Sequence, residues 1–144
     1  MTNEELRELF ASARNIAVVG LSSNPERSSH QIASYLQRQG YRIFPVNPRE
    51  TEVLGEKAYA RLEDVPGKTD IVNVFRRSEE VPPVADSAIA IGARCLWLQV
   101  GVEHAEAESK ARAAGLQVIS NACIMAVHRM LAFSQQSVSL KKER

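Results

Sequence analysis

An apolar run passes directly into a serine-rich segment in Ile16-Ala-Val-Val-Gly-Leu-Ser-Ser-Asn-Pro-Glu-Arg-Ser-Ser-His30. Residues 16–19 are wholly apolar and mostly branched, which is typical of a strand covered on both faces. Gly20 ends this strand and lets the backbone turn. Ser28 or Ser29 can then cap a helix. The stretch therefore predicts a strand, a polar loop and a helix, the first part of a βαβ unit.

The same alternation of strands and helices continues along the chain. The predicted strands cover residues 16–19, 42–46, 70–75, 95–100 and 116–119, and the predicted helices cover residues 2–13, 28–39, 79–91, 103–114 and 122–133, with a short helical turn near Leu62. Strands separated by helices imply right-handed crossovers and a parallel sheet with helices on both faces. We therefore expect an α/β fold with a doubly wound, parallel five-stranded sheet that is Rossmann-like. We expect one domain over residues 1–135 and a tail over residues 136–144 that frays at the C-terminus.

The composition disfavours several classes of partner. The chain has 144 residues with 18 basic and 17 acidic side chains, which gives a net charge of +1. This balance creates no field of one sign for nucleic acid or an anionic membrane, and no apolar run is long enough to span a bilayer. Cys95 and Cys123 form neither a disulfide framework nor a paired metal motif. We expect a cytoplasmic protein with reduced thiols that binds neither nucleic acid nor a membrane.

The loop after the first strand is a candidate anion site. In doubly wound sheets, ligands bind beyond the carboxyl ends of the strands. Gly20 allows a close approach of the backbone, the following helix offers free N–H groups, and Arg27 adds a cation suited to phosphate. Hydroxyl groups that can donate to phosphate oxygens belong to Ser22, Ser23, Ser28 and Ser29. The alternative is an ordinary polar loop with a helix cap, and the position of the loop favours the phosphate site.

The residues that follow the second predicted strand limit the class of nucleotide that the site can bind. A nicotinamide dinucleotide site normally has a three-glycine turn and an acidic residue after the second strand. This chain has one glycine in the first loop and Asn47-Pro48-Arg49 after the second strand. Arg49 can pair with a ribose phosphate or a pyrophosphate, so phosphorylated adenosine ligands other than NAD fit better and NADP remains open. A P-loop lysine is absent, and the widely separated His30, His104 and His128 do not favour a zinc motif.

Five segments follow one another in a specific order. They are Ile16-Ala-Val-Val-Gly-Leu-Ser-Ser-Asn-Pro with Arg27-Ser28-Ser29, Tyr41-Arg-Ile-Phe-Pro-Val-Asn-Pro48, Asp70-Ile-Val-Asn-Val-Phe-Arg-Arg77, Leu96-Trp-Leu-Gln-Val-Gly101 and Asn121-Ala-Cys-Ile-Met125. With these segments, over about residues 6–133, the chain resembles the small stand-alone coenzyme A-binding proteins of bacteria and archaea. More distantly, it is similar to the nucleotide-binding domain of the succinyl-CoA synthetase alpha subunit.

This resemblance implies a coenzyme A site at the edge of the sheet. The loop from Gly20 to Ser28 would hold phosphate, and the corner Asn47-Pro48-Arg49 would reach the phosphorylated ribose or the adenine. The end of the third strand, Val74-Phe75-Arg76, would line the path of the adenine and the pantetheine arm. Phe75 offers an apolar face there, and Arg76 and Arg77 offer cations. The alternative for these two arginines is a solvated entrance to the next helix.

Cys123 is the last candidate site residue. The family usually has aspartate, arginine and cysteine after the fifth strand, whereas this chain has Asn121-Ala122-Cys123. Near a helix start the dipole favours a thiolate, so Cys123 could form a mixed disulfide with the thiol of the coenzyme. A small packed cysteine is the alternative.

No catalytic constellation can be assembled from the sequence, because no nucleophile with an oriented base and no converging acid and base are found. The chain is therefore predicted to bind coenzyme A or an acyl-CoA, a small-molecule ligand, without evident catalysis. It would carry, sense or deliver this cofactor, with a possible protein partner. The alternatives are an NAD(P)-binding redox enzyme or sensor on the same fold and an interaction module whose nucleotide pocket is vestigial.

Overall fold

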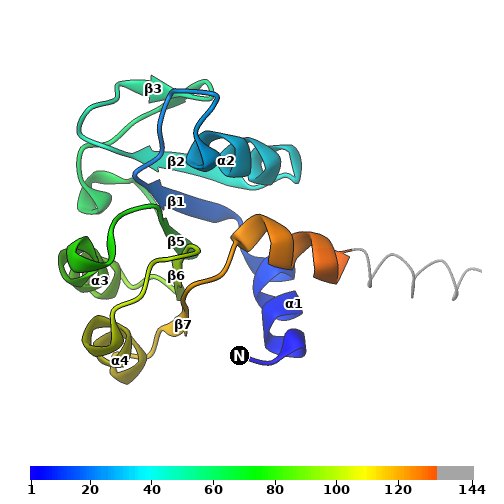
Figure 1. Ribbon diagram of the computed structural model, residues 1–144, viewed down its shortest axis with the longest axis vertical. Helices are drawn as coiled ribbons and strands as arrows, with labels where there is room; N and C mark the ends of the chain where they lie inside the picture. The colour runs from blue at the N-terminus through cyan, green and yellow to red at the C-terminus, as the bar shows by residue number, and fades with distance from the viewer. Residues whose placement is uncertain (133–144) are drawn as a thin grey trace, which may run out of the picture.

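A computed structural model describes residues 1–132 (Figure 1). In chain order the elements are α1 (Asn3–Ser12), β1 (Asn15–Val19), α2 (Ser28–Arg38), β2 (Arg42–Val46), β3 (Glu52–Val53), β4 (Glu56–Lys57), the 3-10 turn η1 (Leu62–Asp64), β5 (Ile71–Val74), the 3-10 turn η2 (Ser78–Glu80), α3 (Val81–Ala90), β6 (Cys95–Leu98), α4 (Ala105–Ala113) and β7 (Gln117–Ile119). A last helix covers residues 124–132, and the tail predicted over residues 136–144 lies outside the described residues. No helix in the described part is both long and apolar enough to cross a membrane.

Five strands form one parallel sheet in the order β2-β1-β5-β6-β7. β1 lies between β2 and β5, with Ile16 in register with Ile43 on one side and Ile71 on the other. From β1 the chain proceeds to β2 at one edge, and from β5 it proceeds through β6 to β7 at the other edge. The strand order therefore reverses between β1 and β5. This topology confirms the predicted doubly wound, Rossmann-like α/β fold with five parallel strands.

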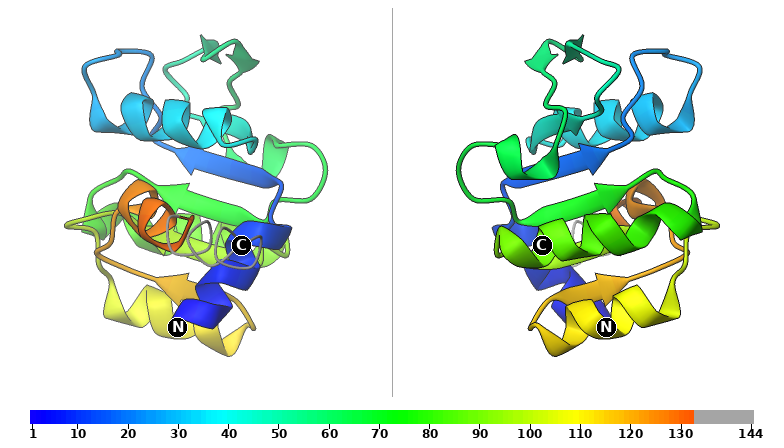
Figure 2. Two further views of the ribbon diagram at one scale, coloured as in Figure 1. Left: turned by 90° about the vertical axis from the view of Figure 1, so that its right-hand side faces the viewer. Right: turned by 90° about the vertical axis from the view of Figure 1, so that its left-hand side faces the viewer.

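The alternation of side chains along the strands divides the core into two layers. Val19 belongs to an apolar cluster with Ala85 of α3 and Ala111 of α4. Its neighbour on the strand, Val18, belongs to a second cluster with Leu36 of α2, residues of α1 and residues of the last helix. Figures 1 and 2 show α3 and α4 on one side of the sheet and α1, α2 and the last helix on the other. Each face of the sheet is thus covered, as strands that are mostly apolar on both faces require.

The helix starts agree only in part with the prediction. α1 begins within the predicted helix, at a capping box: the N–H of Glu5 donates to Thr2 Oγ1 at 3.1 Å, and the N–H of Thr2 donates to Glu5 Oε1 at 3.2 Å. The predicted serine cap of α2 is wrong. Its N-cap residue is Arg27, Ser28 is already helical, and the hydroxyl of Ser29 accepts a hydrogen bond from a residue of the preceding loop.

A short antiparallel hairpin, β3–β4, is an element that the sequence did not predict. Leu54 and Gly55 link its strands with φ values of 56° and 77°, which are typical of a type I′ turn. Val53 is buried in the cluster that contains α2, and Gln37 of α2 donates through Nε2 to the Leu54 carbonyl oxygen at 3.1 Å. The hairpin therefore packs with α2, near the C-terminal end of that helix.

Buried aromatic side chains connect α2 to the last helix. The Tyr35 hydroxyl lies 2.7 Å from His128 Nδ1 in a buried hydrogen bond. The His128 ring meets the rings of Phe10 and Tyr41 edge to face, and burial lowers its pKa. His128 is therefore a packed histidine that holds two helices together, and both of these helices begin near the ligand edge of the sheet.

Asp70 fastens the start of β5 to the start of β1. Its Oδ2 accepts hydrogen bonds from the N–H groups of Arg14 at 2.8 Å and Asn15 at 3.0 Å, and Arg94 lies 3.7 Å from Oδ1. Burial by itself raises the pKa of Asp70, but these N–H groups and the charges of Arg94 and Lys68 outweigh burial and hold the pKa below its ordinary value. The stabilisation is therefore complete above the ordinary aspartate pKa and is lost as the pH falls through the lowered one.

We expect Asp70→Asn to lower the free energy of unfolding at neutral pH by about 1–3 kcal/mol, because a neutral amide oxygen accepts the two N–H groups less strongly than a carboxylate does. Urea unfolding of both proteins, at neutral pH and at about pH 3, measures this effect. The difference between them should shrink at the lower pH, where the aspartate becomes protonated. An equal difference at both pH values would contradict the role of the carboxylate charge.

Candidate functional site

The candidate site lies where the strand order reverses, at the carboxyl ends of β1 and β5. The N–H of Gly20 donates to the Val46 carbonyl oxygen, and the N–H of Phe75 donates to the Val19 carbonyl oxygen, both at 2.8 Å. These bonds extend the pairing of β1 with β2 and with β5 by one residue. Beyond them the loops that follow β1, β2 and β5 diverge. Ligands of doubly wound sheets bind at this edge.

Gly20 is required here for two reasons. Its φ of +89° lies in the region that favours glycine. A Cβ atom at this position would also overlap the carbonyl oxygen of Phe75 and lie 3.4 Å from Nε of Arg76. The first loop therefore crosses directly over the end of β5, with no space for a side chain between them.

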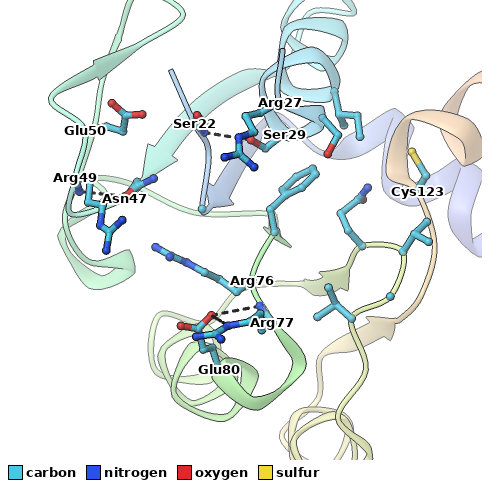
Figure 3. A pocket seen from close by; sticks show the side chains of 18 residues that line it. Ser22, Arg27, Ser29, Asn47, Arg49, Glu50, Arg76, Arg77, Glu80 and Cys123 are labelled. Atoms are coloured by element: carbon cyan, nitrogen blue, oxygen red, sulfur yellow. Dashed lines mark hydrogen bonds and ion pairs between the residues drawn. The ribbon is translucent and has the colours of Figure 1, made fainter. Parts of the chain in front are cut away.

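A cavity of about 840 Å³ opens beside this crossing (Figure 3). Nine of the twelve predicted site residues line it, namely Gly20, Ser22, Arg27, Ser28, Asn47, Arg49, Phe75, Arg76 and Cys123. The other three lie outside it. Ser23 is exposed on the loop, Val74 is fully buried on the α3 side of the sheet, and Pro48 lines a neighbouring cavity of about 510 Å³.

Helix α2 begins at the cavity without a side-chain cap. Ser28 and Ser29 line the cavity, and no capping hydrogen bond from a side chain to the start of α2 is found among residues 1–132. The first turn of α2 also contains no acidic residue. By contrast, Thr2 caps α1, His104 caps α4, and each of these helices has two glutamates in its first turn. The N–H groups and the positive dipole end of α2 are therefore free to meet an anion.

Two serine hydroxyls beside this helix start are oriented by the backbone. The N–H of Ser22 donates to Ser29 Oγ at 3.1 Å, and the N–H of Asn24 donates to Ser22 Oγ at 3.0 Å. A hydroxyl that accepts a hydrogen bond keeps its own proton for another acceptor. Ser22 and Ser29 both line the cavity, so each hydroxyl can donate to a ligand oxygen there.

Glu50 holds the same loop from the opposite side. The N–H of Ser23 donates to Glu50 Oε2 at 2.6 Å, and Glu50 itself lines the cavity. The N–H of Ser23 is thus already satisfied by a carboxylate from the segment after β2. Glu50 also brings a negative charge to a wall that carries several arginines.

Asn47 shapes the loop more than it faces a ligand. Its Nδ2 donates to the Leu21 carbonyl oxygen at 3.1 Å, and its Oδ1 accepts from the N–H of Arg49 at 3.0 Å. Both polar atoms of the side chain are engaged within the protein. Asn47 therefore ties the end of β2 to the first loop and turns the backbone at Arg49.

Three arginines of the cavity wall lack a carboxylate partner. Within residues 1–132, no Asp or Glu oxygen lies within 4 Å of the charged nitrogens of Arg27, Arg49 or Arg76. Figure 3 shows Arg76 extending toward Arg49. Arg77 differs, because its Nε lies 3.6 Å from Glu79 and 3.7 Å from Glu80. Arg76 therefore matches the prediction of a cation available to a ligand. Arg77 matches the alternative, a solvated residue at the entrance to the next helix.

The wall at the ends of β6 and β7 is neutral. Gln99, Val102 and Cys123 line the cavity there, across the sheet from β2, and Figure 3 shows Cys123 on the far side of the cavity from Arg49. Gln99 is only 6% exposed, and its Oε1 accepts hydrogen bonds from the N–H of Ile124 at 3.0 Å and from Asn73 Nδ2 at 3.1 Å. The Gln99 side chain thereby fixes the start of the last helix, directly after Cys123.

The two cysteines have different surroundings. Cys95 is fully buried in β6, and burial raises its pKa to about 12. Cys123 is half-buried and lies in the cavity wall. Among residues 1–132, no group of three or more His, Cys, Asp or Glu side chains is arranged to hold a metal ion.

Several lining residues were not predicted from the sequence. They are Ile32, Glu50, Glu80, Gln99, Val100, Gly101 and Val102. Gln99 directly follows the last residue of β6, so the rule that ligands meet the carboxyl ends of strands could have identified it. Glu50 lies in a polar link with no periodicity, and its contact with Ser23 depends on the tertiary arrangement.

The fold and the site define a doubly wound α/β protein with an arginine-lined cavity at the strand ends. The chain belongs to the family described as CoA binding domain, whose model matches residues 14–129. It is 43% identical over 124 residues to the uncharacterized protein YneT of Bacillus subtilis, a match that covers 86% of this chain and 92% of that protein. A solved structure of a Thermus thermophilus protein is 38% identical with a TM-score of 0.88, covering 91% of this chain and 99% of that chain.

A partial match connects the chain to ligases. Over 65 residues it is 38% identical to the alpha subunit of the ADP-forming acetate–CoA ligase II of Pyrococcus furiosus. This match covers 44% of this chain and only 14% of that subunit. The resemblance to the coenzyme A-binding domain of synthetase-type alpha subunits is thereby confirmed, and it concerns that domain alone.

We expect Gly20→Ala to destabilise the protein more than the control variant Gly115→Ala does. Gly115 also has a positive φ, +96°, but no atom lies within 4 Å of a Cβ built there. The control should cost only the left-handed conformation, about 1–2 kcal/mol. Gly20→Ala should cost a further 1–3 kcal/mol, roughly, because the Phe75 carbonyl must move. Chemical denaturation of both variants measures the difference, and equal costs would show that the crossing over β5 relaxes without strain.

Proposed function

We propose that this protein binds coenzyme A or an acyl-CoA in the cavity at the carboxyl ends of β1 and β5. The observation that carries the proposal is the start of α2, which has no side-chain cap within residues 1–132, beside three arginines that have no carboxylate partner there. Coenzyme A has negative charge in two places, on its pyrophosphate and on its ribose phosphate, which suits donors spread along one wall. Membership of the CoA binding domain family supports the same ligand.

Each part of the ligand has a matching part of the wall. The start of α2, the hydroxyls of Ser22 and Ser28, and Arg27 would hold the pyrophosphate. Arg49, at the β2 end, would hold the ribose phosphate. Pro48 would offer an apolar surface to the adenine from the neighbouring cavity, which shares Arg76 and Glu80 with the first. The proposal assigns no catalytic residue and describes a cofactor-binding protein of the cytoplasm.

Calorimetric titration of the purified, nucleotide-free protein under reducing conditions tests this proposal. The ligands are coenzyme A, acetyl-CoA, NAD and NADP. We expect heats of binding for the first two and none for NAD. Binding of NADP alone would contradict the proposal and favour an NAD(P)-linked redox protein, and binding of none would favour an interaction module.

The charge of Arg49 should distinguish two closely related ligands. We expect Arg49→Glu to weaken coenzyme A binding by about tenfold or more and to weaken dephospho-coenzyme A binding by less than about threefold. The matched control is Arg38→Glu, the same charge reversal at the other end of α2, about 15 Å from the helix start. Titration of each variant with both ligands gives the comparison. An equal loss for both ligands would remove Arg49 from the ribose-phosphate role.

The charge of Glu50 should oppose the ligand. In Glu50→Gln the side chain keeps an oxygen that can accept the N–H of Ser23, but it loses the negative charge beside the phosphates. We expect coenzyme A to bind about threefold to fivefold more tightly to this variant, with the gain decreasing at high salt. Titrations at two salt concentrations measure both effects. Weaker binding would show that the carboxylate is needed to hold the loop.

A further inference from the structure

We propose that Cys123 is the attachment site for a covalently held coenzyme A, which it acquires by thiol–disulfide exchange with a coenzyme A disulfide. This inference rests on the proposed function, because the same cavity has to recognise the nucleotide first. It adds the orientation of the bound ligand in the cavity and a covalent modification of Cys123. Three observations carry it, namely the charge gradient of the cavity, the position of Cys123 and the Nε2 group of Gln99, which has no acceptor among residues 1–132.

The charge gradient of the cavity sets the direction of the ligand. The unpaired arginines Arg27, Arg49 and Arg76 line the part near α2, β2 and β5. The wall at the ends of β6 and β7 contains Gln99, Val102 and Cys123, and within residues 1–132 no cation lines this part of the cavity. Phosphates are stabilised at the first part, so the uncharged pantetheine arm with its terminal sulfur extends toward the second.

Cys123 is the thiol at that second part. It is half-buried and lines the cavity, whereas Cys95 is enclosed in the core. The turn that carries Cys123 is held firmly: Trp97 Nε1 donates to the Ala122 carbonyl oxygen at 2.9 Å, and the N–H of Ile124 donates to Gln99 Oε1 at 3.0 Å. The sulfur is therefore kept at the wall of the cavity by bonds on both sides of residue 123.

Gln99 supplies an independent sign of a ligand at this place. Its side chain is more than nine-tenths buried and lines the cavity, and its Oε1 is used twice within the protein. Among residues 1–132, Nε2 has no acceptor. Because Gln99 lines the cavity, this group can donate to an acceptor on a ligand there. The amide carbonyls of pantetheine are acceptors of this kind, and the nearer one is separated from the terminal sulfur by two methylene groups and one nitrogen.

The exchange needs no external oxidant. The Cys123 thiol gives its proton to water, and Sγ attacks one sulfur of the coenzyme A disulfide. A bond forms between Sγ and that sulfur while the original S–S bond breaks. The second coenzyme A leaves as a thiolate and takes up a proton from water. One disulfide replaces another, so electrons and atoms balance.

Intact-protein mass spectrometry tests the inference. The wild-type protein is incubated with three disulfides at equal concentration: coenzyme A disulfide, pantethine, which lacks the nucleotide, and bis(2-hydroxyethyl) disulfide, which lacks the pantetheine amides as well. We expect the adduct to form in that order of rate, with coenzyme A disulfide at least about tenfold faster than bis(2-hydroxyethyl) disulfide, because the cavity holds it in place. Desulfo-coenzyme A, which keeps the phosphates and lacks the thiol, should slow the first reaction.

Two variants complete the test. Cys123→Ser should form no adduct, whereas Cys95→Ser should form the adduct at the wild-type rate and bind reduced coenzyme A like the wild type. Equal rates for the three disulfides would overturn the inference, since they would show only a reactive thiol. So would binding of reduced coenzyme A without any adduct, an outcome that leaves the proposed function intact. Failure of reduced coenzyme A to bind would overturn both proposals.

Discussion

Gly20 passes the carbonyl oxygen of Phe75 with no space for a side chain between them. The N–H of Gly20 donates to the Val46 carbonyl oxygen, and the N–H of Phe75 donates to the Val19 carbonyl oxygen. Because of these bonds, β2, β1 and β5 end side by side at the same edge of the sheet. The first loop is thereby directed over the end of β5, and Asn47 fastens it on the β2 side. The start of α2 comes to lie at the cavity as a consequence of this crossing. A larger residue at position 20 would change the loop, the helix start and the cavity together.

The uncapped start of α2 shows how local stability and binding oppose each other. A serine, threonine or aspartate cap contributes about 0.5–2 kcal/mol to a helix, and both α1 and α4 have a capping side chain. At α2 the nearest hydroxyl, Ser29, accepts the N–H of Ser22 instead and orients the loop. Among the residues that the structure describes, the donors of the helix start therefore lack a capping side chain. An anion in the cavity would supply that partner, so ligand binding and local order at this end of α2 are coupled.

The sequence predicted the fold through its strands and failed where contacts depend on the tertiary structure. Short apolar runs identified all five parallel strands within a few residues, because strands buried on both faces must be apolar throughout. The hairpin at Leu54 gave a weak signal, since leucine rarely adopts a positive φ and only Gly55 indicated a turn. Residues at strand ends, such as Phe75 and Arg76, were predicted to face a ligand and do line the cavity. The hydrogen bonds of Glu50 and Ser29 could not be predicted, because each is made to a backbone N–H of the first loop and depends on how that loop folds back.

The two ends of the cavity are built from different chemistry, and this difference limits how an asymmetric anion can lie in it. At the β2 end the side chains are cations and the helix start adds positive charge. At the β6 and β7 end the turn after β7 is held by neutral groups: Asn121 Oδ1 accepts the N–H of Gly101 at 2.7 Å, and the indole of Trp97 donates to the next carbonyl. A carboxylate in that turn would attract the cations of the other end or repel a phosphate. With neutral groups it does neither, so the cations of the β2 end and the distribution of charge on a ligand would together determine which of its ends lies beside Cys123.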